Sequence, residues 1–108
     1  MGKEYLVKRA VRDILRELGC WYCMPQGTGF AASGVMDFIA CYQGQCLGIE
    51  CKSGKNRTTA LQDKVIRELE QAGGRAIVIN EDNVQQLKEW ICQQQVPLVR
   101  SGICSPRA

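Results

Sequence analysis

The sequence predicts an α/β fold in which a mixed central β-sheet is flanked by helices. Apolar residues recur at helical spacing over residues 3–18, and two apolar-rich runs lie between residues 37 and 52. Residues 75–79 form a third, strand-like run rich in β-branched side chains. With 108 residues, of which 45% are hydrophobic, the chain has the size of a single domain, 1–108.

Residues Lys3 to Leu18 are predicted to form an amphipathic helix that ends at Gly19. Glu4 falls on its apolar stripe, either complementing the helix dipole or directed at the protein interior. The opposite face is basic, which suits either plain solvent exposure or contact with a phosphate backbone. Its residues are Lys8, Arg9, Arg12 and Arg16.

Residues 37–52 are predicted to form a β-hairpin with Gln43-Gly44 as its two-residue loop. Opposed residues then have numbers that sum to 87, so Asp37 faces Glu50. Their carboxylates would share one face with Cβ atoms about 5 Å apart, and the strand period of two adds Lys52 to that face. Two acids and one lysine therefore converge.

Two interpretations of this cluster are open. It could be an ordinary solvated ion cluster, because charge clusters are only a probabilistic sign of function. Alternatively, a shared divalent cation offsets the repulsion between the two acids. The run Leu47–Cys51 is almost entirely apolar, which indicates a strand buried on both faces. Since buried charges need partners, this run favours the second interpretation.

After the hairpin, Thr59 is predicted to cap a helix that ends at residues 73–74. Gln62 completes a Thr-x-x-Gln capping box, and the preceding turn carries Lys55 and Arg57. The other segments follow from their composition. We expect a short strand at Trp21–Met24, a flexible loop at Gln26–Gly34, a strand at 75–79 parallel to a hairpin strand, a helix at 80–94 capped by Asp82 or Asn83, and no periodic element at 96–108.

Composition narrows the chemistry. The sequence contains no histidine, which excludes catalysis and metal binding by imidazole. A net charge of +3 is too small to indicate nucleic-acid binding by itself. No apolar run approaches the ~20 residues of a membrane helix. Because the first residues are charged rather than signal-like, a cytoplasmic location is expected.

The chain has seven cysteines, an odd number without a secretory signal, which argues against a disulfide framework. Most of them fall within apolar runs and are interpreted as small hydrophobic side chains. The alternative is a zinc site formed by Cys20, Cys23, Cys41 and Cys46.

The order Gly34-Val35-Met36-Asp37, then Gly48-Ile49-Glu50-Cys51-Lys52, then Gln62, resembles the PD-(D/E)xK nuclease signature. The pattern is similar to that of its virus-type replication-repair nuclease (VRR-NUC) branch, over about residues 4–80. This resemblance implies a restriction-endonuclease-like αβββαβ core. Met36 stands where the family usually has proline, a departure that removes no ligand.

The resemblance also implies a role for each residue. Asp37 and Glu50 would hold Mg²⁺ or Mn²⁺, with a backbone carbonyl near Cys51 as a third oxygen ligand. Lys52 would position or help deprotonate the attacking water and stabilise the transition state. Glu4 matches a first-helix glutamate that many of these nucleases use as an additional metal ligand, directly or through water.

Gln62 matches the motif glutamine, which would lie near the scissile phosphate or orient the catalytic lysine. We expect this role to coexist with helix capping only if the side chain turns away from its own helix N-terminus. Contacts with the DNA backbone are expected from basic residues on the first helix and on the turn after the hairpin. These residues are Lys8, Arg12, Lys55 and Arg57.

A single small domain of this branch implies a stand-alone phage or prophage enzyme that acts in the bacterial cytoplasm on branched or duplex DNA. Resolving a four-way junction needs two symmetric cuts, which a C₂ homodimer supplies. We therefore expect an Mg²⁺- or Mn²⁺-dependent, structure-selective endonuclease, namely a dimeric Holliday-junction resolvase. The alternatives are a nicking or flap endonuclease and, outside enzymes, a non-catalytic nucleic-acid-binding module.

Overall fold

A computed structural model describes residues 3–25 and 34–94, and it confirms the α/β fold. The predicted loop at 26–34 and the segment 96–108 therefore lie almost wholly outside the described residues. The elements are α1 (Lys3–Glu17), β1 (Trp21–Cys23), β2 (Phe38–Tyr42), β3 (Gln45–Cys51), α2 (Ala60–Gln71), β4 (Arg75–Ile79), the 3₁₀ turn η1 (Val84–Gln86) and α3 (Leu87–Gln93). Within the described ranges, no helix is both long enough and apolar enough to cross a membrane.

The four strands form one mixed sheet in the order β1-β2-β3-β4. β2 and β3 pair antiparallel in the predicted register, from Tyr42 opposite Gln45 to Phe38 opposite Ile49. Gln43 and Gly44 both have positive φ, as a tight two-residue hairpin loop requires. β4 pairs parallel to β3, also as predicted. The hairpin register is what brings the two acids of the motif to the same end of the sheet.

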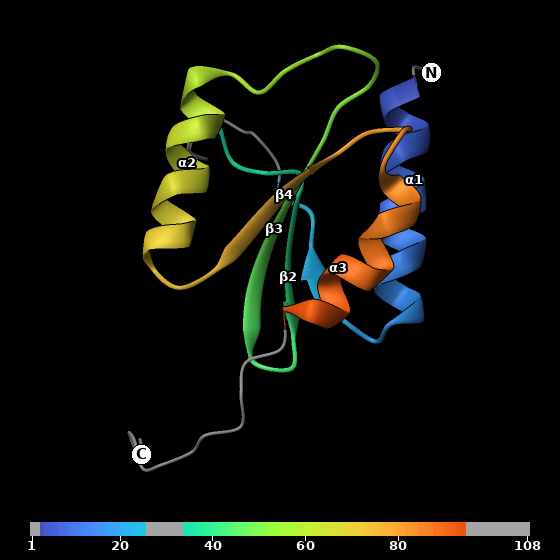
Figure 1. The fold of residues 1–108 in the computed structure, drawn as a ribbon, viewed down its shortest axis with the longest axis vertical. Coiled ribbons are helices and arrows are strands. Elements are labelled where there is room, and N and C mark those ends of the chain that lie inside the picture. Colours follow the sequence, from blue (N-terminus) through green and yellow to red (C-terminus); the bar gives the residue numbers. More distant parts are fainter. Residues whose placement is uncertain (1–2, 26–33, 95–108) are drawn as a thin grey trace.

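Helices cover both faces of the sheet. Figure 1 shows α2 on one side and α1 with α3 on the other. Because side chains alternate along a strand, Leu47, Ile49 and Cys51 of β3 face α1 and α3, whereas Gly48 and Glu50 face α2. The main core lies on the first face. It contains Val7, Val11, Leu15, Phe38, Ala40, Leu47, Ile49, Cys51, Ile79, Leu87 and Ile91.

The start of the last helix is where the structure differs most from the prediction. Residues 80–94 were expected to be one helix, but the chain makes a turn, then η1, and only then α3. The side chain of Asn80 explains the delay, because its Oδ1 accepts hydrogen bonds from the backbone N–H groups of Asp82 and Asn83. Neither of those two residues caps the segment with its side chain as predicted; the Asn83 Oδ1 instead accepts from the N–H of Asn80.

Candidate active site

Asp37 immediately precedes β2, and its carboxylate is fixed by the backbone of β3. Its Oδ2 accepts a hydrogen bond of 2.8 Å from the N–H of Cys51. Because Cys51 follows Glu50 directly, this bond places Asp37 beside the second acid, as the hairpin register predicts. The Cys51 side chain points the other way and is fully buried in the core, also as predicted.

Met36 holds the chain before Asp37 by packing. It is buried, and it covers the backbone of Gly48 so closely that a Cβ on Gly48 would lie 2.5 Å from the Met36 Cε. The prolines usual at this position of the motif restrain the backbone through their ring. Here a methionine that fits the gap over a glycine positions the same segment.

Glu50 is a buried acid with one free oxygen. Its Oε2 accepts a hydrogen bond of 2.8 Å from Gln62 Nε2 and lies 3.4 Å from the Lys52 Nζ. Its Oε1 is buried and has no hydrogen-bond partner within the part of the chain that the structure describes. Burial, and then the nearby charge of Asp37, raise the pKa of Glu50 to about 7, although Lys52 acts in the opposite direction.

Gln62 corrects one expectation about the site. Its Nε2 donates to Glu50, while its Oε1 accepts from the N–H of Thr59, and the Thr59 Oγ1 accepts from the N–H of Gln62. The capping box and the contact with the acid are therefore made together, and the side chain does not turn away from its helix N-terminus. The expectation was wrong because an amide has a donor end and an acceptor end that can serve two partners at once.

Lys8 and Glu4 form the α1 side of the site. The Lys8 Nζ lies 3.4 Å from Asp37 Oδ1 and 3.7 Å from Glu4 Oε2. Burial lowers the pKa of Lys8, but the Asp37 carboxylate more than offsets this, so the pKa lies above its ordinary value. Sequence reasoning placed Lys8 with the solvent-facing arginines, whereas the structure places it against the first acid.

Glu4 does not form a close group of three carboxylates with Asp37 and Glu50. Among the residues that the structure describes, no three acidic or cysteine side chains come close enough together to hold a metal ion. The Glu4 carboxylate instead contacts Lys8, four residues further along the same helix. In this arrangement Glu4 pairs with Lys8, and its role as a metal ligand, directly or through water, stays a prediction.

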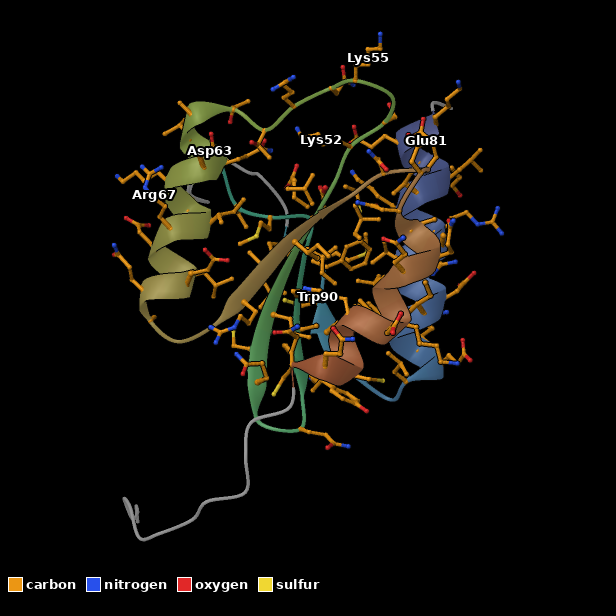
Figure 2. The ribbon with its side chains drawn as sticks, viewed as in Figure 1. Lys52, Lys55, Asp63, Arg67, Glu81 and Trp90 are labelled. Atoms are coloured by element: carbon orange, nitrogen blue, oxygen red, sulfur yellow. The ribbon has the colours of Figure 1, made fainter. Side chains whose placement is uncertain are left out.

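The other predicted DNA-contacting residues lie on the loop after β3 and on α1. Lys55 and Arg57 are exposed on the loop between β3 and α2, and Figure 2 shows Lys55 directed into solvent beyond Lys52. Arg12 lies further along α1, where its Nε is 3.7 Å from an oxygen of Asp13. Lys55 and Arg57 are therefore open to contact with a phosphate, whereas Arg12 lies beside the acid that follows it in the chain.

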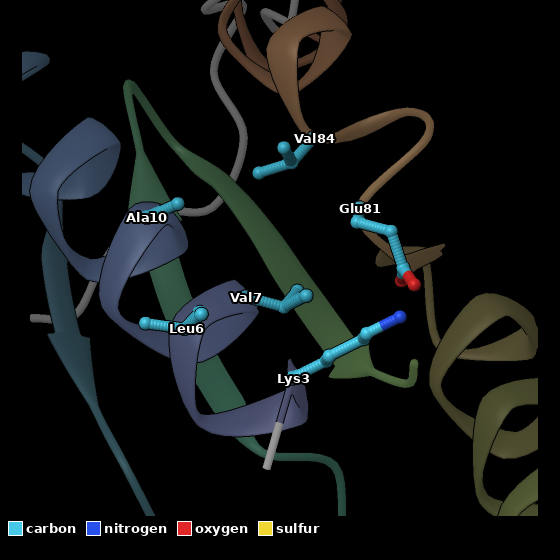
Figure 3. A pocket seen from close by; sticks show the side chains of 6 residues that line it. All are labelled: Lys3, Leu6, Val7, Ala10, Glu81 and Val84. Carbon is cyan, nitrogen blue, oxygen red and sulfur yellow. The ribbon is translucent and has the colours of Figure 1, made fainter. Parts of the chain in front are cut away.

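Glu81 was not anticipated from the sequence. Both of its carboxylate oxygens accept from the N–H of Gly54, at 3.0 and 2.9 Å, which fastens the loop after Lys52 to the end of β4. A signal was available, since β3 and β4 are parallel and the residues after them emerge at the same edge of the sheet. Glu81 also lines an apolar pocket with Lys3, Leu6, Val7, Ala10 and Val84 (Figure 3).

The cysteines do not form the zinc site considered above. Cys41 and Cys46 are opposed across the hairpin as predicted. However, Cys20, Cys23, Cys41 and Cys46 are all described as free thiols, and no three potential ligands in the described ranges form a metal-binding group. Free thiols therefore account for these four residues.

The donor set at Asp37 and Glu50 suits a hard cation. Both acids offer carboxylate oxygens, and the unpartnered Glu50 Oε1 is the kind of buried atom that a cation satisfies. Two carboxylates are also enough for Mg²⁺, which usually keeps several water ligands. The residues present therefore fit the expected metal, whose remaining ligands would be backbone oxygen and water.

No protein-family model and no curated protein sequence matches this chain. A solved structure described as a VRR_NUC domain has a similar fold, with a TM-score of 0.71 and 20% sequence identity over 82% of this chain and 97% of that chain. Hjc, a Holliday junction resolvase from Archaeoglobus fulgidus, has a TM-score of 0.49 and 24% identity over 68% of this chain and 65% of that chain. The first likeness confirms the fold predicted from the motif; the second is too weak to carry an argument.

The metal-free site should destabilise the protein at neutral pH. The pKa of Glu50 is raised from its ordinary 4.5 to about 7. The contribution of Glu50 to the free energy of unfolding is therefore fully present below pH 4.5 and is lost as the pH rises through 7. The loss amounts to about 3 kcal/mol. Glu50→Gln should remove this slope in urea unfolding measured with EDTA between pH 5 and 8.5. Glu68→Gln, on the exposed side of α2, is the matched control and should keep the slope; an unchanged slope in Glu50→Gln would contradict the assignment.

Proposed function

We propose that this protein is a metal-dependent nuclease that hydrolyses phosphodiester bonds. The observation that carries the proposal is the convergence of Asp37, Glu50 and Lys52 at one end of a sheet whose fold is that of a VRR_NUC domain. The spacing of the motif in the sequence predicts that these residues lie together, and their contacts in the structure agree with this prediction. An ion cluster without function would not need an acid buried with an unpartnered oxygen.

Asp37 and Glu50 would hold Mg²⁺ or Mn²⁺, with a backbone carbonyl near Cys51. When bound, such an ion supplies Lewis-acid chemistry, lowering the pKa of water and offsetting phosphate charge. Gln62 keeps the Glu50 carboxylate in one orientation through its 2.8 Å hydrogen bond. The Lys52 ammonium, which is only partly exposed beside Glu50, would orient or help deprotonate the attacking water and stabilise negative charge in the transition state.

Branched DNA is the proposed substrate, and a C₂ homodimer the proposed active form. Support comes from the sequence pattern: residues 1–108 contain no zinc-finger or helix-turn-helix pattern for reading bases. The exposed Lys55 and Arg57 suit contact with the phosphate backbone, which carries no sequence information. Two symmetric incisions at a four-way junction would follow from the two-fold axis.

Cleavage of synthetic DNA tests this proposal. We expect Mg²⁺ or Mn²⁺ to support paired, symmetric cuts in an end-labelled four-way junction, with much weaker cleavage of linear duplex. EDTA should stop the reaction, and added metal should restore it. Cuts in one strand only, with preference for a flap, would favour the flap endonuclease instead. Binding without cuts under all metal conditions would favour the non-catalytic module, and cleavage that survives EDTA would exclude the mechanism.

A further inference from the structure

The two lysines of the site differ in how much of the neighbouring carboxylate they leave without a partner. Lys52 lies 3.4 Å from Glu50 Oε2 and leaves Oε1 without a partner. Lys8, by contrast, lies 3.4 Å from Asp37 Oδ1, while Oδ2 of the same carboxylate is already bonded to the N–H of Cys51. Both oxygens of Asp37 are thus occupied, whereas Glu50 has one oxygen free.

A metal ion held by Asp37 needs the oxygen that Lys8 contacts. An ammonium and a divalent cation on one carboxylate oxygen repel each other, and because the Asp37 side chain is only 21% exposed, water screens this repulsion incompletely. The side chain of Lys8 is about one-third exposed, so its ammonium can also reach a partner in solvent. Glu4, 3.7 Å away on the same helix, keeps it near the site.

We propose that Lys8 is a counter-ion that competes with the metal for Asp37 and that moves to a DNA phosphate when substrate binds. This proposal rests on the nuclease function proposed above and adds a specific coupling to it. Without DNA, Lys8 stabilises Asp37 and weakens metal binding. With DNA, a phosphate draws the ammonium away, so the metal binds more tightly. By thermodynamic linkage, the metal then tightens DNA binding by the same factor.

The free protein provides the first test. Mn²⁺ affinity is measured by electron paramagnetic resonance, which detects unbound Mn²⁺, for the wild type, Lys8→Met, Lys8→Gln and Lys8→Arg. We expect both neutral variants to bind Mn²⁺ about tenfold more tightly and Lys8→Arg to stay within about threefold of the wild type. Lys88→Met is the matched control, because Lys88 is also ion-paired, to Glu17, but on α3, and it should leave the affinity unchanged. Circular dichroism confirms that each variant is folded.

The second test adds DNA in a Lys52→Met background, in which cleavage is not expected. A four-way junction should raise the Mn²⁺ affinity when Lys8 is present and should raise it several-fold less when Lys8 is methionine, after subtraction of Mn²⁺ bound by the DNA alone. If the neutral Lys8 variants behave like Lys88→Met, or if DNA has the same effect in both backgrounds, the competition is refuted while the nuclease proposal stands. If no variant, nor the wild type, binds Mn²⁺, the proposed function itself fails.

Discussion

Asp37→Asn is expected to lower the rate of junction cleavage by a factor on the order of 10²–10³ while leaving DNA affinity within about threefold. The substitution keeps the shape of the side chain, and the amide oxygen can still accept from the N–H of Cys51. What it removes is the negative charge that a divalent cation needs beside Glu50. Single-turnover cleavage of a labelled junction and an electrophoretic mobility shift measure the two quantities separately.

Asp63→Asn is the matched control for this prediction. Asp63 is an exposed acid in the first turn of α2, and its carboxylate accepts a hydrogen bond from the hydroxyl of Thr58. Its loss should cost little stability and should leave the cleavage rate unchanged. Equal rates for Asp37→Asn and the wild type would remove Asp37 from the catalytic machinery. A parallel loss of DNA binding would indicate a structural role instead.

Gly34→Ala should lower the free energy of unfolding by more than Gly19→Ala, the control described below. Gly34 has φ +84°, and a Cβ there would lie 2.7 Å from the backbone carbon and oxygen of Leu61 in the first turn of α2. Left-handed backbone costs an alanine about 1–2 kcal/mol. The collision with the α2 backbone, which cannot rotate away as a side chain could, should add a further ~1–3 kcal/mol. Urea unfolding, with the midpoint and slope both fitted, measures the sum.

Gly19→Ala separates strain from collision. Gly19 has a similar φ of +75°, but a Cβ there would meet no atom within 4 Å. This variant should therefore show only the strain. If the two alanine variants lose the same stability, the close approach between the segment before Asp37 and the start of α2 does not matter. If Gly34→Ala loses much more, this approach holds Asp37 and Gln62 at their mutual distance.

The hairpin shows why part of this site could be predicted from sequence. A two-residue loop with a glycine fixes the pairing of every residue on both strands, so the neighbourhood of Asp37 and Glu50 follows from counting. The start of α2 could also be predicted from the sequence, because the Thr59–Gln62 capping box is a local pattern. In both cases, the information lies within a few residues of the feature it determines.

Contacts between distant segments could not be predicted in the same way. Lys8 meets Asp37, and Glu81 meets Gly54, only because the sheet and helices have packed, and neither pair has a spacing rule. The helical periodicity predicted that Lys8 lies on the solvent-exposed face of α1. A flexible four-carbon side chain can nevertheless reach the end of the sheet from that face. The late start of α3 was missed for a related reason: Asn80 offers the backbone a local alternative to helix.

The close packing of Met36 on Gly48 has a consequence for how this motif can change. A bulkier residue at 48 would collide with the methionine and with Leu69, whereas a proline at 36 would leave part of the space above the glycine without atoms to fill it. The effect of a substitution at position 36 therefore depends on the residue at position 48, and the reverse also holds. We expect substitutions at 36 and 48 to be non-additive, because the two residues are in direct contact. The methionine and the glycine therefore act as one packing unit beneath the segment that carries the first acid.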